Sequence, residues 1–283
     1  MKKIGELLNI DKEGLGGSGR TLAIQEQASV TEFDVFDQAA NNPAPICPMC
    51  HDRGIVISGD VAKPCTCMQK KKIENRFRNA RISRNLLNCQ LESFNVAYYA
   101  SADGRDQQHL QRANKALNAA EEFVNKYKHA ECGEGLLLTG EVGSGKTFLA
   151  AAIANALIKS GRQVLFLIVP DLLDELKATF NKAAELTELD LLDTARTVPV
   201  LILDDLGAHN YTEWTKNRLY SIINYRLNEL LPTVVTSNLT LFEMEEYLGQ
   251  RTTSRLMQMC RVFRLTRETD IRLKKYEERE NIR

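Results

Sequence analysis

One glycine-rich loop constrains the fold of this chain more than any other feature. Residues 140–147 read Gly-Glu-Val-Gly-Ser-Gly-Lys-Thr and match the pattern G-x-x-x-x-G-K-[ST]. The apolar run Leu136–Thr139 precedes the loop, and the helical pattern Phe148–Ile158 follows it. A strand, such a loop and a helix in this order form a phosphate-binding unit, because backbone N–H groups and the helix N-terminus face one anion. The pattern predicts that Lys146 reaches the β- and γ-phosphates of a nucleotide and that the Thr147 hydroxyl coordinates Mg²⁺.

The predicted nucleotide site includes the whole loop and the first residue of the following helix. Its members are Gly140, Glu141, Val142, Gly143, Ser144, Gly145, Lys146, Thr147 and Phe148. The alternative is a chance glycine-rich turn, which the flanking strand and helix argue against.

Further apolar runs of strand length alternate with helical patterns after about residue 88. These runs are Val164–Val169, Val198–Leu203, Thr233–Ser237 and Val262–Leu265. Together with Leu136–Thr139 they predict an α/β fold with a parallel five-stranded sheet flanked by helices. One connecting helix has a single predicted buried face, because its apolar residues recur every three to four positions. Its members are Leu219, Ile222, Ile223, Leu227 and Leu230.

Polar side chains follow two of the predicted strands. Asp204 and Asp205 come directly after Val198–Leu203, and Asn238 follows Thr233–Ser237. Buried carboxylates are costly unless they are paired or bound to metal, and parallel strands carry ligands at their carboxyl ends. We therefore expect Asp204 to share Mg²⁺ with the phosphate loop and Asp205 to polarise an attacking water, with a helix N-cap pair as the alternative. Asn238 is expected to bond the γ-phosphate or that water, unless it only forms a turn.

Sequence composition limits the compartment and the class of protein. The chain has no apolar stretch of about 18 residues, and Met1–Glu6 does not begin a secretory signal, so we expect a cytoplasmic protein without a membrane partner. Lys and Arg number 37, as do Asp and Glu, which argues against a protein that coats polyanions wholesale. Residues 63–84 nevertheless hold eight basic side chains and one acidic one. Such a run has a partner or lies on a solvated helix, and both readings stay open.

Four of the seven cysteines lie close together in the sequence. Cys47 and Cys50 form a C-x-x-C pair, and Cys65 and Cys67 form a C-x-C pair 14 residues later. Four thiolates satisfy tetrahedral Zn²⁺, and in a reducing compartment clustered cysteines favour metal over disulfides. The spacing therefore predicts a small zinc-binding module at about 45–70. Unmetallated buried thiols and a redox C-x-x-C are the alternatives. The remaining cysteines, Cys89, Cys132 and Cys260, are interpreted as core or incidental residues.

The motifs together resemble one known family. A phosphate loop at 140–147, Val-Leu-Ile-Leu-Asp-Asp-Leu-Gly at 200–207, Thr-Ser-Asn at 236–238, Ser-Arg-Leu at 254–256 and Asp-Ile-Arg at 270–272 occur in that order. This order resembles the AAA+ ATPases of the bacterial replicative-helicase loader group, the DnaC/DnaI type, in its Firmicutes and phage versions. The resemblance divides the chain into an N-terminal helicase-interaction region, 1–87, and an AAA+ ATPase domain, 88–283.

The resemblance also implies residue roles. Asn238 would be sensor 1, Arg255 the arginine finger that reaches a neighbouring subunit's ATP site, and Arg272 sensor 2 in its own subunit. Phe94, in the segment Leu91–Phe94, would line the adenine side. The finger would tie hydrolysis to assembly, because an arginine supplied in trans neutralises transition-state charge only after subunits stack.

A function follows from the resemblance as an expectation. The protein would bind ATP, Mg²⁺ and Zn²⁺, associate with itself, and load a hexameric replicative helicase onto single-stranded DNA, with slow ATP hydrolysis as an assembly and release switch. Segments Asp171–Ala195 and 209–218 are candidates for DNA contact. The alternatives are a transposition helper ATPase of the IstB type, a small-molecule P-loop kinase, and an adaptor in which nucleotide is only structural.

Overall fold

The computed structural model describes residues 47–58, 61–100, 107–130, 133–179, 187–208, 211–267 and 270–281. Expectations that concern residues 1–46, Cys132 and His209 lie outside the described residues. The described chain from Cys47 onward forms one compact unit.

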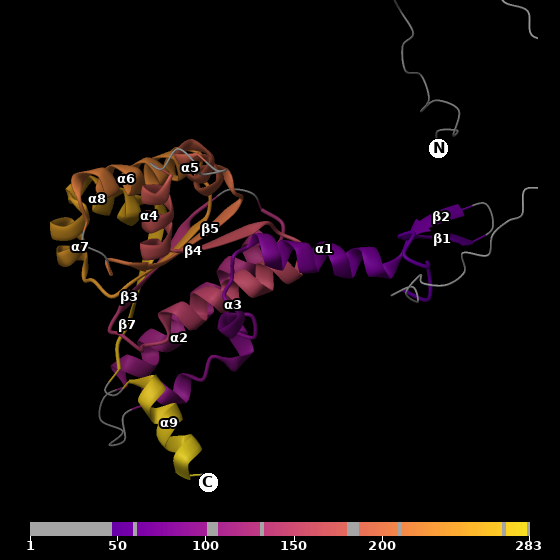
Figure 1. Cartoon of the computed structure of the whole chain (residues 1–283). Helices are drawn as coiled ribbons and strands as arrows, with labels where there is room; N and C mark the ends of the chain where they lie inside the picture. Colours follow the sequence, from indigo (N-terminus) through magenta and orange to yellow (C-terminus); the bar gives the residue numbers. More distant parts are fainter. Residues whose placement is uncertain are drawn as a thin grey trace, which may run out of the picture. The chain divides into compact units, whose positions relative to one another are not determined.

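Five parallel strands form the central sheet, in the order β4-β5-β6-β3-β7 (Figure 1). The strands are β3 Gly135–Gly140, β4 Val164–Ile168, β5 Val200–Leu206, β6 Thr233–Ser237 and β7 Cys260–Leu265. This arrangement confirms the predicted parallel sheet. Two boundaries differ from the sequence prediction: Val169 begins the next helix, and β5 continues through both aspartates to Leu206.

Helices cover both faces of the sheet, so the domain has three layers (Figure 1). Alternate strand residues face opposite sides: Leu136 and Leu138 pack with α2 and α3, whereas Leu137 packs with α4 through α8. This alternation follows from the period of two along a strand. The helices are α2 Gln108–Tyr127, α3 Lys146–Lys159, α4 Val169–Ala178, α5 Glu188–Thr197, α6 Glu213–Asn228, α7 Leu241–Leu248, α8 Gln250–Met259 and α9 Ile271–Asn281.

Helix α6 carries most of the predicted apolar face. Leu219, Ile222 and Ile223 are fully buried, and Leu227 is partly buried against the same core. Leu230 was wrongly placed on this face: it lies beyond the end of α6, has φ of 52° and is 58% exposed. The chain turns here toward β6, so the helical period no longer decides where the side chain points.

A small module precedes the five-stranded core. Strands β1 Ile55–Ser58 and β2 Val61–Pro64 form an antiparallel hairpin, and α1 Thr66–Asn79 follows it (Figure 1). Helix α1 packs on α3, and the Phe166 amide donates a 2.8 Å hydrogen bond to the carbonyl of Ala80. Ala80 therefore belongs to the hydrophobic core, although it precedes the predicted domain boundary at residue 88.

Three short 3₁₀ helices connect α1 to the core: η2 Arg84–Leu86, η3 Leu91–Ser93 and η4 Val96–Tyr99. Asn155 of α3 holds this connection, because its side-chain amide donates to the carbonyls of Leu86 and Cys89. Within the described part of the chain, no helix has the length and apolar character needed to cross a membrane.

Candidate functional site

The glycine-rich loop connects β3 to α3, as predicted. Gly140, Gly143 and Gly145 have φ of 135°, 76° and 86°, a region that favours glycine. Space is limited as well: a Cβ at Gly143 would lie 2.1 Å from a carboxylate oxygen of Asp270. The glycines therefore allow the backbone to wrap around the N-terminus of α3, where anions bind.

Lys146 is held inside this loop. The residue is 6% exposed, and its Nζ donates hydrogen bonds to the carbonyl oxygens of Gly140 at 2.8 Å and Glu141 at 2.7 Å. Burial lowers the pKa of Lys146 to about 8, although the nearby carboxylates of Asp205 and Asp204 favour its charged form. An ammonium held by two carbonyls at the loop is placed to contact phosphate oxygens.

The two aspartates lie at an irregularity of β5. The register between β5 and β6 shifts between Leu203 and Leu206, and Asp205 has φ of 60°. Thr236 of β6 stabilises this region: its hydroxyl donates a 2.6 Å hydrogen bond to Asp204 Oδ1 and accepts one from the Asp205 amide at 2.9 Å. The irregularity interrupts the alternation of side chains along the strand, and Asp204 and Asp205 both line one cavity.

Asp204 is buried beside the predicted magnesium ligand. Burial raises its pKa, and hydrogen bonds from the hydroxyls of Thr236 and Thr147 oppose the rise. The structure thus brings the Thr147 hydroxyl and the Asp204 carboxylate together, and these oxygen ligands suit Mg²⁺. Asp205 is more exposed and accepts a 3.0 Å hydrogen bond from the Asn238 amide.

A cavity of about 560 Å³ joins these groups. From the predicted site, its walls include Phe94, Val142, Gly143, Ser144, Gly145, Lys146, Thr147, Phe148, Asp204, Asp205, Asn238 and Arg272. A cavity of this volume is large enough for a nucleotide. Gly140 and Glu141 do not line it but bind Lys146 through their carbonyls.

Aromatic rings form one wall of the cavity. The ring of Phe94 lies 5.6 Å from that of Tyr99 and 6.2 Å from that of Phe148, measured between centroids. The Tyr99 hydroxyl donates to the carbonyl of Ser144 in the phosphate loop. The predicted Phe94 thus faces the cavity, and its position against Phe148 suits an adenine ring.

Several residues that line the cavity are not among the predicted site residues. Tyr98, Tyr99 and Lys275 lie in the wall, as do Ser83 and Asn85 near the end of α1. Lys275 Nζ is 5.6 Å from the ring centroid of Tyr98 and 5.5 Å from that of Phe148. The Tyr-Tyr pair so soon after Phe94 was the available signal, whereas no pattern marked Lys275.

The start of α9 is fastened to the phosphate loop, and this places Arg272 at the cavity. The Ile271 amide donates to the carbonyl of Gly143 at 3.3 Å, and Arg267 donates to the carbonyl of Val142. Arg267 also pairs with Asp270 at 3.4 Å. Because these contacts hold the start of α9 against the phosphate loop, they also fix the position of Arg272 relative to that loop.

Arg255 lies outside this cavity. It is on α8, its Nε donates to Asn224 Oδ1 on α6, and its guanidinium carbon is 5.1 Å from the centroid of the Tyr220 ring. Within one chain the arginine therefore does not reach the predicted phosphate site. Its role as a finger for a neighbouring subunit stays a prediction.

In the described parts of the candidate DNA-contact segments, basic side chains form ion pairs with carboxylates. Lys216 pairs with Glu213 at 3.1 Å, and Arg218 pairs with Glu188 and lies 5.3 Å from the Trp214 ring centroid. The segment Asp171–Ala195 forms parts of α4 and α5, and its residues 180–186 lie outside the described residues. These ion pairs leave Lys216 and Arg218 with less charge available for DNA.

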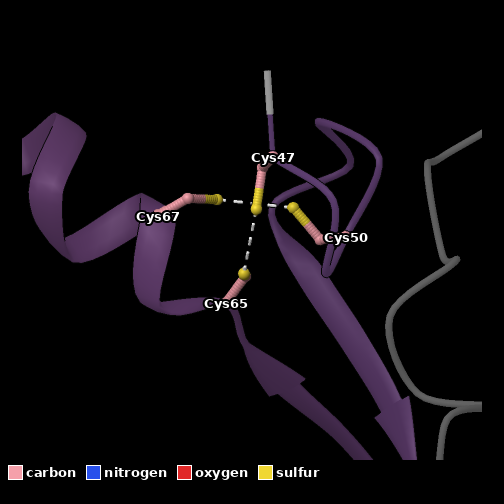
Figure 2. A group of neighbouring side chains, drawn as sticks. All are labelled: Cys47, Cys50, Cys65 and Cys67. Carbon is pink, nitrogen blue, oxygen red and sulfur yellow. Dashed lines mark hydrogen bonds between the residues drawn. The ribbon is translucent and has the colours of Figure 1, made fainter. Parts of the chain in front are cut away.

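The four clustered cysteines form a second candidate site (Figure 2). Their Sγ atoms all lie within 4.8 Å of one another; the Cys47–Cys65 distance is 3.7 Å and the Cys50–Cys67 distance is 3.3 Å. Tetrahedral zinc with Zn–S bonds of about 2.3 Å needs sulfur separations of about 3.8 Å, so the donor set fits. His51 does not belong to the cluster.

Backbone geometry shapes the first cysteine pair into a tight turn. The His51 amide donates to the carbonyl of Cys47, and His51 and Asp52 have φ of 47° and 62°. Hydrogen bonds from the backbone amides of Cys50 and Met49 lower the pKa of the Cys47 thiol to about 7. Such a turn favours the thiolate that binds metal.

The sheet order, the phosphate loop after β3 and the acidic end of β5 together define a P-loop ATP-binding fold of the AAA+ class. More narrowly, the chain belongs to the family described as IstB-like ATP binding protein, whose model matches residues 61–278.

Two similar proteins are both named replicative helicase loaders. The replicative helicase loader DnaI of Bacillus subtilis (strain 168) is 29% identical over 180 residues, which are 63% of this chain and 53% of that protein. The chain thus matches about half of the length of DnaI. The replicative helicase loader DnaC of Escherichia coli (strain K12) is 28% identical over 185 residues, or 65% of this chain and 69% of DnaC.

A solved structure agrees with this placement. The crystal structure of DnaI has a TM-score of 0.53 and 30% identity, and the match covers 67% of this chain and 94% of that chain. The resemblance stated from the motifs is therefore confirmed.

Proposed function

We propose that this protein is an ATPase that loads a replicative DNA helicase onto single-stranded DNA. One observation carries the proposal: Lys146, Asp204, Asn238 and Arg272 converge on a single cavity, in a chain whose relatives are named replicative helicase loaders. The shared family supports the ATP-binding part, and the relatives' names support the loader part.

The proposed chemistry assigns one task to each group at the phosphate end. Lys146 binds the β- and γ-phosphates, and Thr147 with Asp204 holds Mg²⁺. Bound Mg²⁺ supplies positive charge to the phosphate oxygens. Asp205 orients the attacking water and accepts its proton, while Asn238 fixes the direction of the Asp205 carboxylate.

Two arginines complete the proposed site. Arg272 contacts the phosphates of its own subunit from the start of α9. Arg255 enters the site of a neighbouring subunit when the chains stack, which makes hydrolysis depend on assembly. The second acid is Asp205 where many AAA+ proteins have Glu, and its shorter side chain suits slow hydrolysis and a switch that releases the loader.

The cysteine module would bind one Zn²⁺ through Cys47, Cys50, Cys65 and Cys67. We assign recruitment of the helicase to the N-terminal region that contains it. The protein would act in the cytoplasm, where the replicative helicase and single-stranded DNA are found.

Co-purification tests the loader proposal. The tagged full-length chain is mixed with the replicative helicase from the same source, with ATP, with ADP and without nucleotide. We expect the helicase to be retained and the complex to respond to nucleotide, with Lys146→Ala losing the response. Failure to retain the helicase under all three conditions would contradict the proposal.

A transposition helper is the second candidate function, because the matching family model carries the IstB description. The same co-purification distinguishes the two functions when it is repeated with a transposase of the IS21 type in place of the helicase. Retention of the transposase alone favours the helper function.

A further inference from the structure

Helix α1 presents an unusually basic face to solvent. Lys71, Lys72 and Arg78 are exposed, and together we call them the α1 cations. Lys71 and Arg78 are seven residues apart, so they lie on the same side of the helix, two turns from each other. Glu74 is the acidic residue of α1, so the helix has a clear excess of positive charge.

The α1 cations differ from many other surface cations of this chain. Elsewhere in the described residues, cations pair with carboxylates, as in Arg196–Asp193, Lys216–Glu213 and Arg261–Glu122. None of the ion pairs found in the described part of the chain includes an α1 cation. On this face Glu74 is the one nearby acidic side chain among the described residues, so two or more of the three positive charges remain for a partner.

The helix that carries these cations is fastened at both ends. At its start, Cys65 and Cys67 belong to the cysteine cluster (Figure 2). After its end, the carbonyl of Ala80 accepts a hydrogen bond from the Phe166 amide of β4, and Arg81 pairs with Glu175 of α4 at 2.6 Å. The spacing of the cations is thus fixed before any partner binds, which lowers the entropy cost of binding.

The spacing fits a chain of phosphates. Seven residues of helix extend about 10 Å, and at about 3.4 Å per nucleotide of a stacked strand this length covers about three phosphates. Helix α1 holds one aromatic residue, Phe77, and from Lys71 to Asn79 its exposed side chains in the described part of the chain are all charged or polar. A partner recognised through its charged backbone therefore fits better than an acidic protein surface.

We propose that the α1 cations bind the sugar-phosphate backbone of single-stranded DNA, independently of base sequence. This inference rests on the proposed function, in which the protein holds single-stranded DNA. It places one contact outside the ATP-binding core, on the helix that connects the cysteine cluster to that core. DNA bound there would lie beside the module to which we assign the helicase.

Binding of a fluorescein-labelled oligothymidylate to the full-length protein, followed by anisotropy across about 50–200 mM salt, tests the inference. The variant K71Q/K72Q/R78Q removes the three charges and keeps good helix formers at each position. We expect its Kd to rise about tenfold or more at low salt. The slope of log Kd against log salt should fall by about 2, because each of the three lost phosphate contacts contributes about 0.7 to it.

A matched variant controls for net charge. K115Q/K126Q/K128Q removes three exposed cations from α2 and the residue that follows it, and should leave Kd and slope close to those of the wild type. Equal DNA binding by the α1 variant and the wild type would overturn the inference while leaving the loader function standing. Loss of helicase capture with DNA binding intact would also overturn it, because the face would then bind protein. If the wild type binds no oligothymidylate, both this inference and the DNA part of the proposed function fail.

Discussion

The Asn238 side-chain amide lies 3.0 Å from Asp205 Oδ1 and donates a hydrogen bond to it. Asp205 lies within the register shift of β5, and Asn238 follows the neighbouring strand β6. The bond therefore crosses between two strands and fixes the carboxylate that faces the cavity. The neighbouring carboxylate on β5, that of Asp204, instead accepts a hydrogen bond from the Thr236 hydroxyl.

Asn238→Ala should impair hydrolysis much more than ATP binding, because Asn238 orients a group that acts on water. We expect phosphate release to fall by about 10²-fold, within the usual contribution of general base catalysis, while the Kd for ATP changes little. Phosphate release and nucleotide titration on the same preparation give the two numbers. A large rise in Kd with unchanged turnover would instead make Asn238 a binding residue.

Raising the pH should weaken ATP binding through Lys146. Burial lowers the pKa of this lysine to about 8, so the free protein carries the ammonium below that pH and loses it above. Because phosphate binds the charged form, the Kd should rise by up to about tenfold per pH unit above that pKa, and binding should take up a proton there. Calorimetry in buffers of different ionisation enthalpy measures the uptake.

Lys146→Arg is the control for this pH dependence. A guanidinium stays charged throughout the range, so any ATP binding that remains in this variant should be nearly independent of pH. The same pH dependence in Lys146→Arg and in the wild type would assign the titration to another group.

Purified protein should contain about one zinc per chain. Cys67→Ser should lower the zinc content and make the hairpin β1–β2 sensitive to protease, because the metal closes this small module. ATP binding should persist, since the cluster cysteines do not line the nucleotide cavity. Elemental analysis and limited proteolysis measure both effects. The control is Cys89→Ala, which removes a buried cysteine outside the cluster and should leave the zinc content unchanged. If wild-type protein purified without chelator contains no zinc, the proposed site is excluded.

Arg255→Ala should leave ATP binding by one subunit nearly unchanged and lower hydrolysis in the assembly by about 10³-fold or more, as for other arginines supplied in trans. Mixing it with Lys146→Ala should restore some activity, because a subunit with intact Lys146 can receive Arg255 from its neighbour. Arg251→Ala, an exposed arginine on the same helix, should remain active. If the mixture stays inactive although the subunits exchange, Arg255 does not act in trans.

Much of the fold and the phosphate end of the site could be predicted from sequence. The phosphate loop specifies its own backbone, and apolar runs of strand length marked all five strands of the sheet. Asp204 and Lys146 could be placed near each other because the carboxyl ends of parallel strands meet at one edge. The cysteine spacing likewise predicted that Cys47, Cys50, Cys65 and Cys67 lie together.

The base end of the cavity could not be predicted in the same way. Tyr98 and Tyr99 lie in a short 3₁₀ helix, which is too short to show a period, and Lys275 reaches the cavity from a helix about 130 residues further along the chain than the phosphate loop. The register shift at Asp205 and the turn at Leu230 depend on tertiary contacts, so local periodicity gave no warning of either.

Transfer of the helicase onto closed circular single-stranded DNA tests the central claim most directly. A circle offers no end over which a ring-shaped helicase can thread, so loading requires a protein that opens or assembles the ring on the strand. We expect the helicase to displace an annealed oligonucleotide from the circle efficiently only with this protein and ATP, and we expect Lys146→Ala not to support the reaction. Equal displacement with and without the protein, at helicase concentrations where the helicase alone is inefficient, would contradict the loader function.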